Sequence, residues 1–275
     1  MEIGIFSRTY ERMSLEAVFR QMDRQGIRHT QFNLSSAGMA ALPDSVDEET
    51  LLTVRALAKK YGITLDALSG TFNMIDPDVD ARTRGCRQFE TQCRAARLLG
   101  IPIVTLCTGS RHPTNKWAWH EDNLTEAAWS DLMRSTEQIL RSAQDNGIIL
   151  GVETEASNII CTPEKARRYL DDVGSSNLKI IMDGANLFRP EQVPRMGSIL
   201  EEAFDALGKD IVLAHAKDFS LGQDIDFVAA GEGELDFPLY IRLLKQCGYG
   251  GPLVLHGLAQ SQIEKSVAFL KRAMA

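Results

Sequence analysis

The sequence predicts an α/β protein that folds as a single-domain (β/α)8 barrel, the TIM-barrel fold. Short apolar runs alternate with longer amphipathic segments along all 275 residues, which gives eight strand–helix pairs of about 34 residues each. A strand followed by a crossover helix implies parallel pairing. Eight such pairs favour a closed barrel over a doubly wound open sheet, and no GxGxxG follows the first strand as in a dinucleotide-binding sheet.

Four of these pairs occupy the first half of the chain. Ser14 stands where a helix N-cap is expected, and Gly62, Gly100 and Gly147 follow predicted helices at the position where glycine commonly ends them. We expect strands at Glu2–Ser7, Thr30–Leu34, Ile63–Ser69 and Pro102–Cys107, and helices at Ser14–Gln25, Glu48–Tyr61, Ala81–Leu99 and Thr125–Asn146.

The other four pairs fill the second half. Thr162 and Pro163 have the N-cap and first-turn positions of a helix, and Gly208 and Gly248 end two others. We expect strands that begin at Ile148, Lys179, Ile211 and Leu253 and run into Glu153, Asp183, His215 and His256, and helices at Pro163–Val173, Val193–Leu207, Phe237–Cys247 and Gln260–Met274.

Charge and composition exclude several classes of partner. The formal net charge of −7 argues against a nucleic-acid-binding or anionic-membrane surface. No apolar stretch approaches the roughly 18–20 residues that span a bilayer. The five cysteines are scattered and form no CxxC pair, so we expect reduced thiols in a cytoplasmic protein.

Four successive apolar runs each end on a residue that can bind a metal. These residues are Glu153, Asp183, His215 and His256, separated by 30, 32 and 41 residues, and each gap is about one strand–helix unit. The carboxyl ends of neighbouring parallel strands meet at one end of a barrel, where catalytic groups of this fold lie. Each residue alone is more often a helix cap or a satisfied polar group. Together, two carboxylates and two imidazoles indicate a site for Mn²⁺, Fe²⁺, Co²⁺ or Zn²⁺.

Five segments carry a resemblance to a known family: Leu150–Glu153, Met182–Asn186, His215–Asp218, Gly231–Phe237 and Gly248–His256. With them the chain resembles the xylose-isomerase-like barrel superfamily of sugar isomerases and epimerases, a relative of the apurinic-site endonuclease fold. The likeness covers essentially the whole chain and is strongest from Leu150 onward.

The resemblance implies one divalent ion held by Glu, Asp, His and a second Glu on the last four strands. Glu153, Asp183 and His215 match that set, whereas His256 stands where the second Glu is usual. Asn186 also departs, because related ketose epimerases often carry His at that position. In those epimerases two glutamates exchange protons on opposite faces of the substrate. Here we expect Glu153 and His256 to be the catalytic pair, since a neutral imidazole can ligate a metal or transfer a proton.

Further polar and aromatic residues are expected to bind substrate. Two long connections, Thr108–Asn123 and Phe219–Asp236, should build the pocket and its lid. Lys217 follows His215 by two residues and could hold a substrate anion, or pair with Asp183 or Asp218 instead. Trp117 could stack on a sugar or pack within its loop. The expected substrate-binding residues are Asn73, Arg111, Trp117, His120, Glu155, Asn158, Asn186 and Lys217, with Arg8, Met74, His112 and Trp119 nearby at the rim.

Two other catalytic motifs are excluded. The segment Gly231-Glu232-Gly233 lacks the following Lys-Ser/Thr of a phosphate-binding P-loop and does not open a helix directly after a strand. No GxSxG elbow for serine hydrolysis is present.

The leading hypothesis is a sugar isomerase or epimerase with one divalent ion, Mn²⁺ before Co²⁺, Mg²⁺, Zn²⁺ or Fe²⁺, and a small carbohydrate as substrate. A dehydratase of a keto-inositol and a non-catalytic sugar-binding barrel are the alternatives. Phosphodiester hydrolysis at abasic DNA is disfavoured by the acidic charge. Barrels of this family often pair, but the sequence has no interface signature, so a homo-oligomer is left open.

Overall fold

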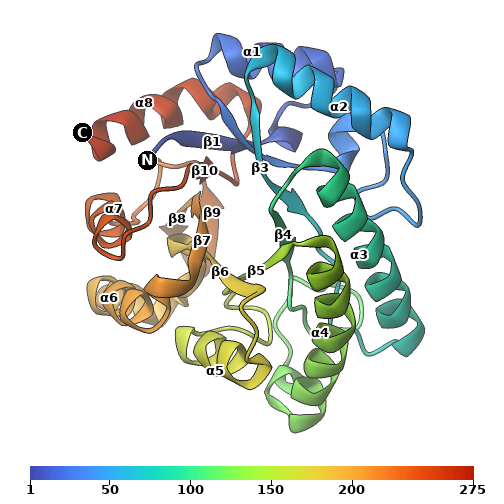
Figure 1. The fold of residues 1–275 in the computed structure, drawn as a ribbon. Coiled ribbons are helices and arrows are strands. Elements are labelled where there is room, and N and C mark those ends of the chain that lie inside the picture. The colour runs from blue at the N-terminus through green and yellow to red at the C-terminus, as the bar shows by residue number, and fades with distance from the viewer.

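The computed structural model describes all 275 residues and confirms the predicted fold: eight parallel strands form one closed barrel with eight helices around it (Figure 1). The barrel strands are β1 (Ile3–Phe6), β2 (His29–Phe32), β3 (Thr64–Ser69), β4 (Ile103–Leu106), β5 (Ile149–Glu153), β6 (Leu178–Asp183), β7 (Ile211–Ala216) and β10 (Leu253–Leu255). Around the ring the order is β1, β10, β7, β6, β5, β4, β3, β2, so β10 closes against β1.

The helices alternate with these strands and cover the outside of the barrel (Figure 1). They are α1 (Leu15–Arg24), α2 (Glu48–Tyr61), α3 (Val79–Leu99), α4 (Glu126–Asn146), α5 (Pro163–Val173), α6 (Met196–Leu207), α7 (Phe237–Gln246) and α8 (Ile263–Met274). Ser14 and Thr162 cap α1 and α5 as predicted, because each hydroxyl accepts a hydrogen bond from the backbone N–H three residues later.

Some helix boundaries differ from the prediction. Helix α3 starts two residues earlier, because the Asp78 carboxylate accepts hydrogen bonds from the backbone N–H groups of Asp80 and Ala81. Helix α6 starts three residues later, at Met196, because Pro190–Arg195 form a 3-10 helix whose prolines have no N–H to donate.

The connection predicted as an irregular loop from Phe219 to Asp236 contains an antiparallel hairpin. Its strands are β8 (Asp218–Leu221) and β9 (Ile225–Val228). The prediction missed this pair because the strands are short, and charged and glycine residues interrupt their apolar pattern.

The buried carboxylate of Asp218 holds the segment after the hairpin in place. It accepts four backbone hydrogen bonds, from the N–H groups of Phe219, Gly231, Gly233 and Leu235, at 2.9 to 3.0 Å. A Cβ on Gly233 would lie 2.2 Å from the Phe219 carbonyl oxygen, so only glycine fits there. The segment Gly231-Glu232-Gly233 therefore cradles an anion, and that anion is the protein's own carboxylate.

Two apolar clusters fill the molecule. The larger contains 67 buried residues and the smaller contains six, each from a strand of the barrel. Neighbouring residues of one strand fall in different clusters, Ile5 in the larger and Phe6 in the smaller, because successive side chains point to opposite faces of the sheet. The smaller cluster fills the barrel interior and consists of Phe6, Ala67, Ile103, Ile181, Leu213 and Val254.

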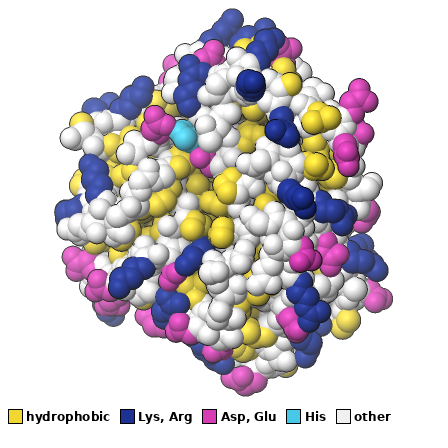
Figure 2. Space-filling view, in the orientation of Figure 1, with side chains coloured by type: hydrophobic (Ala, Val, Ile, Leu, Met, Phe, Trp, Pro, Cys, Tyr) yellow, Lys and Arg dark blue, Asp and Glu magenta, His cyan; other side chains and the backbone are white.

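The surface carries charges of both signs. On the face shown in Figure 2, Lys and Arg side chains are interspersed with Asp and Glu around an apolar centre. All five cysteines are free thiols and four of them are buried. None of the helices combines the length and apolar composition needed to cross a membrane.

Replacement of Asp218 by Asn should destabilise the protein. An amide has one acceptor oxygen in place of two, so buried N–H groups lose partners and the free energy of unfolding should fall by about 3 kcal/mol. Urea denaturation followed by circular dichroism measures this. The matched control is Asp226→Asn on the exposed side of the same hairpin, expected within about 0.5 kcal/mol of wild type. Equal effects of the two substitutions would contradict the anchoring role.

Candidate metal centre

Four side chains that can bind a metal meet at one end of the barrel. Glu153 and Asp183 are the last residues of β5 and β6, His215 is the penultimate residue of β7, and His256 directly follows β10. The strand register pairs Asp183 with His215. One potential ligand atom from each of the four residues lies within 4.8 Å of the others. The convergence predicted from the strand ends is therefore present.

The hydrogen bonding of these residues fits a cation. Asp183 Oδ2 is buried and accepts no hydrogen bond, although Nζ of Lys217 and Nδ1 of His215 and of His256 surround it at 3.5, 3.8 and 3.7 Å. Nδ1 of His256 is also buried without a partner. Unpaired buried polar atoms are rare and costly in proteins. A divalent ion between Asp183 Oδ2 and His256 Nδ1, with Glu153 alongside, would give both atoms a partner.

The charged groups of the cluster shift one another's pKa values. Burial alone would raise the pKa of Asp183, but the Lys217 ammonium and the two imidazoles hold that pKa well below its ordinary range. Burial would lower the pKa of His215, yet the Glu153 and Asp183 carboxylates raise it to about 9. Burial, together with Lys217 and His215, lowers the pKa of His256. At neutral pH Asp183 is ionised and His256 is neutral, with a lone pair free for a cation, whereas His215 carries a proton that a bound cation would displace.

Gln31 orients the His215 ring from the opposite side. His215 Nε2 donates to Oε1 of Gln31 at 2.9 Å, and the Gln31 amide nitrogen donates to Oγ of Ser69 at 2.9 Å. With Nε2 so occupied, Nδ1 faces Glu153 Oε1 at 3.3 Å. A second partner of this kind fixes the tautomer and direction of a metal-binding histidine.

Asn186 and Lys217 extend the cluster. Asn186 Nδ2 donates to Glu153 Oε1 at 2.6 Å, and the Lys217 ammonium donates to Oδ1 of Asn186. Lys217 is 3% exposed and lies 3.5 Å from Asp183 Oδ2. Of the two acidic partners considered for Lys217, the structure thus provides Asp183, because backbone amides already occupy Asp218.

A cavity of about 750 Å³ reaches this cluster at His256 and Lys217. Of the residues predicted to bind substrate, Trp117, Glu155 and Lys217 line it. Burial raises the pKa of Glu155 to about 7, with Glu153 acting in the same direction and Lys217 opposing. The complete lining is Arg8, Trp117, Trp119, Glu155, Ala156, Ser157, Phe188, Arg189, Pro190, Glu191, Lys217, Asp224, Ile225, Phe227 and His256.

The other five residues predicted to bind substrate lie outside this lining: Asn73, Arg111, His120, Asn158 and Asn186. The side-chain amides of Asn73 and Asn158 hydrogen-bond backbone groups of the long connection after β4. His120 caps the short 3-10 helix Glu121–Leu124 through its ring nitrogen. These polar side chains shape the loop that forms one wall of the cavity.

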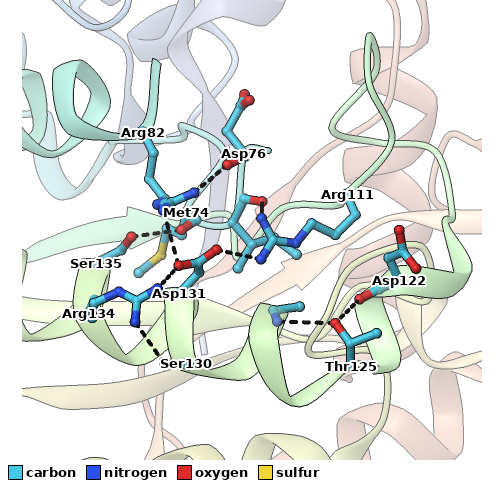
Figure 3. Close-up of polar contacts among 12 residues, drawn as sticks. Met74, Asp76, Arg82, Arg111, Asp122, Thr125, Ser130, Asp131, Arg134 and Ser135 are labelled. Atoms are coloured by element: carbon cyan, nitrogen blue, oxygen red, sulfur yellow. Dashed lines mark hydrogen bonds and ion pairs between the residues drawn. The ribbon is translucent and has the colours of Figure 1, made fainter. Parts of the chain in front are cut away.

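Arg111 belongs to an ion-pair network beside α4 (Figure 3). Its guanidinium donates to the Asp131 carboxylate and to the Ile75 carbonyl oxygen, the latter at 2.9 Å. Arg82 from α3 and Arg134 pair with the same carboxylate. Burial opposes ionisation of Asp131, but Arg111 and Arg134 lower its pKa below the ordinary value. The Arg111 side chain therefore ties its loop to α4 and to the connection between β3 and α3.

Sequence reasoning missed Gln31 and Phe227. Gln31 lies in the mostly polar strand His29-Thr30-Gln31-Phe32, so no local signal in the sequence indicated its buried contact. Phe227 lies on the undetected hairpin, where its ring centroid is 3.6 Å from the Lys217 ammonium nitrogen.

Comparisons with known proteins identify the family of this chain. The model of the xylose isomerase-like TIM barrel family matches residues 9–273. A curated D-psicose 3-epimerase from Enterocloster bolteae is 24% identical over 262 residues, which cover 93% of this chain and 81% of that protein.

Two solved structures share the fold over nearly their full length. The apo form of a 3-keto-D-glucoside 4-epimerase from E. coli superposes with a TM-score of 0.75 at 17% identity, covering 99% of both chains. The IolI protein with a bound zinc atom superposes with a TM-score of 0.74 at 16% identity, covering 99% of this chain and 96% of that one.

Loss of the Gln31 hydrogen bond should weaken metal binding. In Gln31→Leu the His215 ring loses its orienting acceptor, so affinity for Mn²⁺ or Co²⁺ should fall by about 10- to 100-fold. Gln31→Glu keeps an acceptor of the same length and should retain affinity better than Gln31→Leu. Metal titration calorimetry gives the constants, with the exposed Gln144→Leu as control. A folded Gln31→Leu protein with wild-type affinity would refute the positioning role.

Substitution of Arg111 should affect stability. Arg111→Met removes one charge-assisted hydrogen bond to the nearly buried Asp131 carboxylate and one to the Ile75 carbonyl oxygen, and the free energy of unfolding should fall by about 2 kcal/mol at neutral pH. Arg134→Met touches the same carboxylate from a side chain that is 65% exposed, and it should cost less than about 1 kcal/mol.

The effect of Arg111→Met should also depend on pH. Because the pKa of Asp131 is lower in the folded state, the network stabilises the protein above the ordinary carboxylate range and loses that effect as pH falls through the folded pKa. The difference between Arg111→Met and wild type should therefore shrink in acid, as urea denaturation at several pH values would show. A constant difference would contradict the ion-pair explanation.

Proposed function

We propose, on the premise that this chain belongs to the xylose isomerase-like TIM barrel family, that it is a divalent-metal-dependent isomerase or epimerase of a small sugar or sugar derivative. The observation that carries the proposal is the meeting of Glu153, Asp183, His215 and His256 within 4.8 Å, next to a cavity that His256 lines. The curated relative named as a sugar epimerase, and the zinc in the IolI structure, support it.

Glu153, Asp183, His215 and His256 would hold the cation. When bound, a divalent ion would polarise the substrate carbonyl and stabilise the negative charge that develops on its oxygen. The mixed oxygen and nitrogen donors suit Mn²⁺, which we favour, and also Co²⁺, Zn²⁺, Fe²⁺ and Mg²⁺.

We assign proton removal beside the carbonyl to Glu153. Its side chain is 20% exposed, whereas that of Asp183 is fully buried. Hydrogen bonds from Asn186 and His215 both go to Oε1, so the orientation of the carboxylate is fixed. A positioned, partly exposed carboxylate beside His256, which lines the cavity, is suited to act as a general base.

His256 is the assigned partner on the other side. It is a lining residue of the cavity, and its ring stacks on Phe6 with centroids 4.4 Å apart, which limits its rotation. Lys217, Glu155, Asn186 and Trp117 are the proposed substrate-binding residues. Lys217 contributes a fixed positive charge where substrate oxygens would gather, and Glu155 an acceptor for a hydroxyl.

A dehydratase is the second candidate. Only one glutamate belongs to the four-residue cluster, whereas a two-glutamate epimerase needs a carboxylate on each face of the substrate. Elimination of water needs one base and a proton for the leaving hydroxyl, which Glu153 and His256 could supply. The product mass, lower by one water, separates the two reactions.

Exchange with D₂O tests the leading proposal. Metal-loaded protein should incorporate deuterium at the carbon beside the carbonyl of at least one ketose, ketose phosphate or inosose. Glu153→Gln should slow exchange by about 10²- to 10⁴-fold, because it removes the base. The exposed Glu137→Gln serves as control, and NMR of the substrate gives the rates.

Two outcomes would oppose this function. Wild-type protein that binds metal but exchanges no panel member would count against it. Sugar binding without exchange, together with exchange in His256→Glu, would indicate a non-catalytic sugar-binding barrel instead.

A further inference from the structure

We propose that the outer part of the cavity is a subsite for a second sugar ring, so that the substrate is a glycosylated keto sugar. This inference rests on the proposed function, because it takes the metal-binding end of the cavity as the place of reaction. Beyond the proposed function, it names the chemical class of the group that is attached to the reacting sugar and extends toward solvent.

The size of the cavity leaves room for such a ring. A hexose has about twelve non-hydrogen atoms and, even at the roughly 30 Å³ that one water occupies in the liquid for each atom, fills about 360 Å³. The cavity measures about 750 Å³. One hexose over the metal-binding residues would therefore leave about half of the space open.

Aromatic side chains concentrate around that space. Trp117, Trp119 and Phe227 are 49%, 37% and 45% exposed, and all three line this one cavity. They are the only exposed phenylalanine, tryptophan or tyrosine side chains of the protein. Exposed apolar groups gathered at one place mark a binding surface, and flat rings suit the C–H face of a pyranose.

Two elements that are distant in sequence present these rings. Trp117 and Trp119 come from the connection between β4 and α4, and Phe227 comes from β9 of the hairpin. The Arg189 guanidinium lies over the Trp119 ring, 4.6 Å from its centroid. This contact orders the indole before any ligand arrives, which lowers the cost of binding.

The polar groups between the rings favour a sugar over other occupants. Arg8, Arg189, Glu191 and Asp224 line the cavity, and their side chains form no hydrogen bond or ion pair within the protein. Two donors and two acceptors match the hydroxyl groups of a sugar. A phosphate would face Glu191 and Asp224, and a hydrocarbon ring would leave all four groups unused.

The test compares D-fructose with its 4-O-, 5-O- and 6-O-glucosyl derivatives on the metal-loaded protein. Deuterium exchange gives kcat/KM, and calorimetry gives Kd for each sugar. At least one disaccharide should exceed D-fructose by about tenfold or more, as one or two aromatic contacts would provide. Trp119→Ala should reduce that ratio toward one, whereas Phe227→Ala, which removes the ring 3.6 Å from the Lys217 ammonium nitrogen, should weaken the disaccharides and D-fructose alike. The control Leu124→Ala, exposed on the neighbouring loop and absent from the lining, should retain the ratio.

The outcomes separate the two proposals. D-fructose exchange with no gain for any disaccharide would overturn the second-ring subsite while supporting the proposed function. Disaccharide binding that depends on Trp119, without exchange of any sugar, would support the subsite and overturn the function. Absence of both binding and exchange would overturn both.

Discussion

The ionised carboxylate of Asp183 at the mouth of the barrel is the constraint around which the site is organised. It is 2% exposed, and its Oδ2 has no hydrogen-bond partner. A buried charge persists only when nearby charges compensate for its lost hydration. Lys217 supplies part of that compensation, and the two imidazoles supply nitrogen atoms at distances that leave space between them. A bound cation would therefore supply the remaining compensation for the Asp183 charge.

One short segment connects this charge to the pocket. In His215–Asp218, the histidine belongs to the metal cluster, Lys217 faces Asp183, and Asp218 binds the backbone of the following loop. Because Asp218 begins the hairpin, the same carboxylate that fixes the loop also places Phe227 over the Lys217 ammonium. The metal cluster and the wall of the cavity are therefore mechanically linked.

The sequence was sufficient for the fold and for the convergence at the strand ends, because both follow from the period and direction of parallel strands. It was insufficient where tertiary contacts decide the role of a side chain. Arg111 belongs to the long connection that was expected to build the pocket, yet its guanidinium binds the Asp131 carboxylate on α4. Gln31 precedes its partner by 184 residues, so no local pattern could associate it with His215.

The replacement of a carboxylate by His256 changes the charge of the site. The set implied by the family resemblance contains three carboxylates, whereas Glu153 and Asp183 contribute only two here. With the Lys217 ammonium 3.5 Å from Asp183, the cluster has less negative charge to attract hard, oxygen-preferring ions such as Mg²⁺. Two imidazoles favour ions that accept nitrogen donors. The lower negative charge would also repel less strongly the negative charge that develops on a substrate oxygen. The replacement of a carboxylate by His256 therefore weakens one contribution to metal affinity and strengthens one contribution to catalysis.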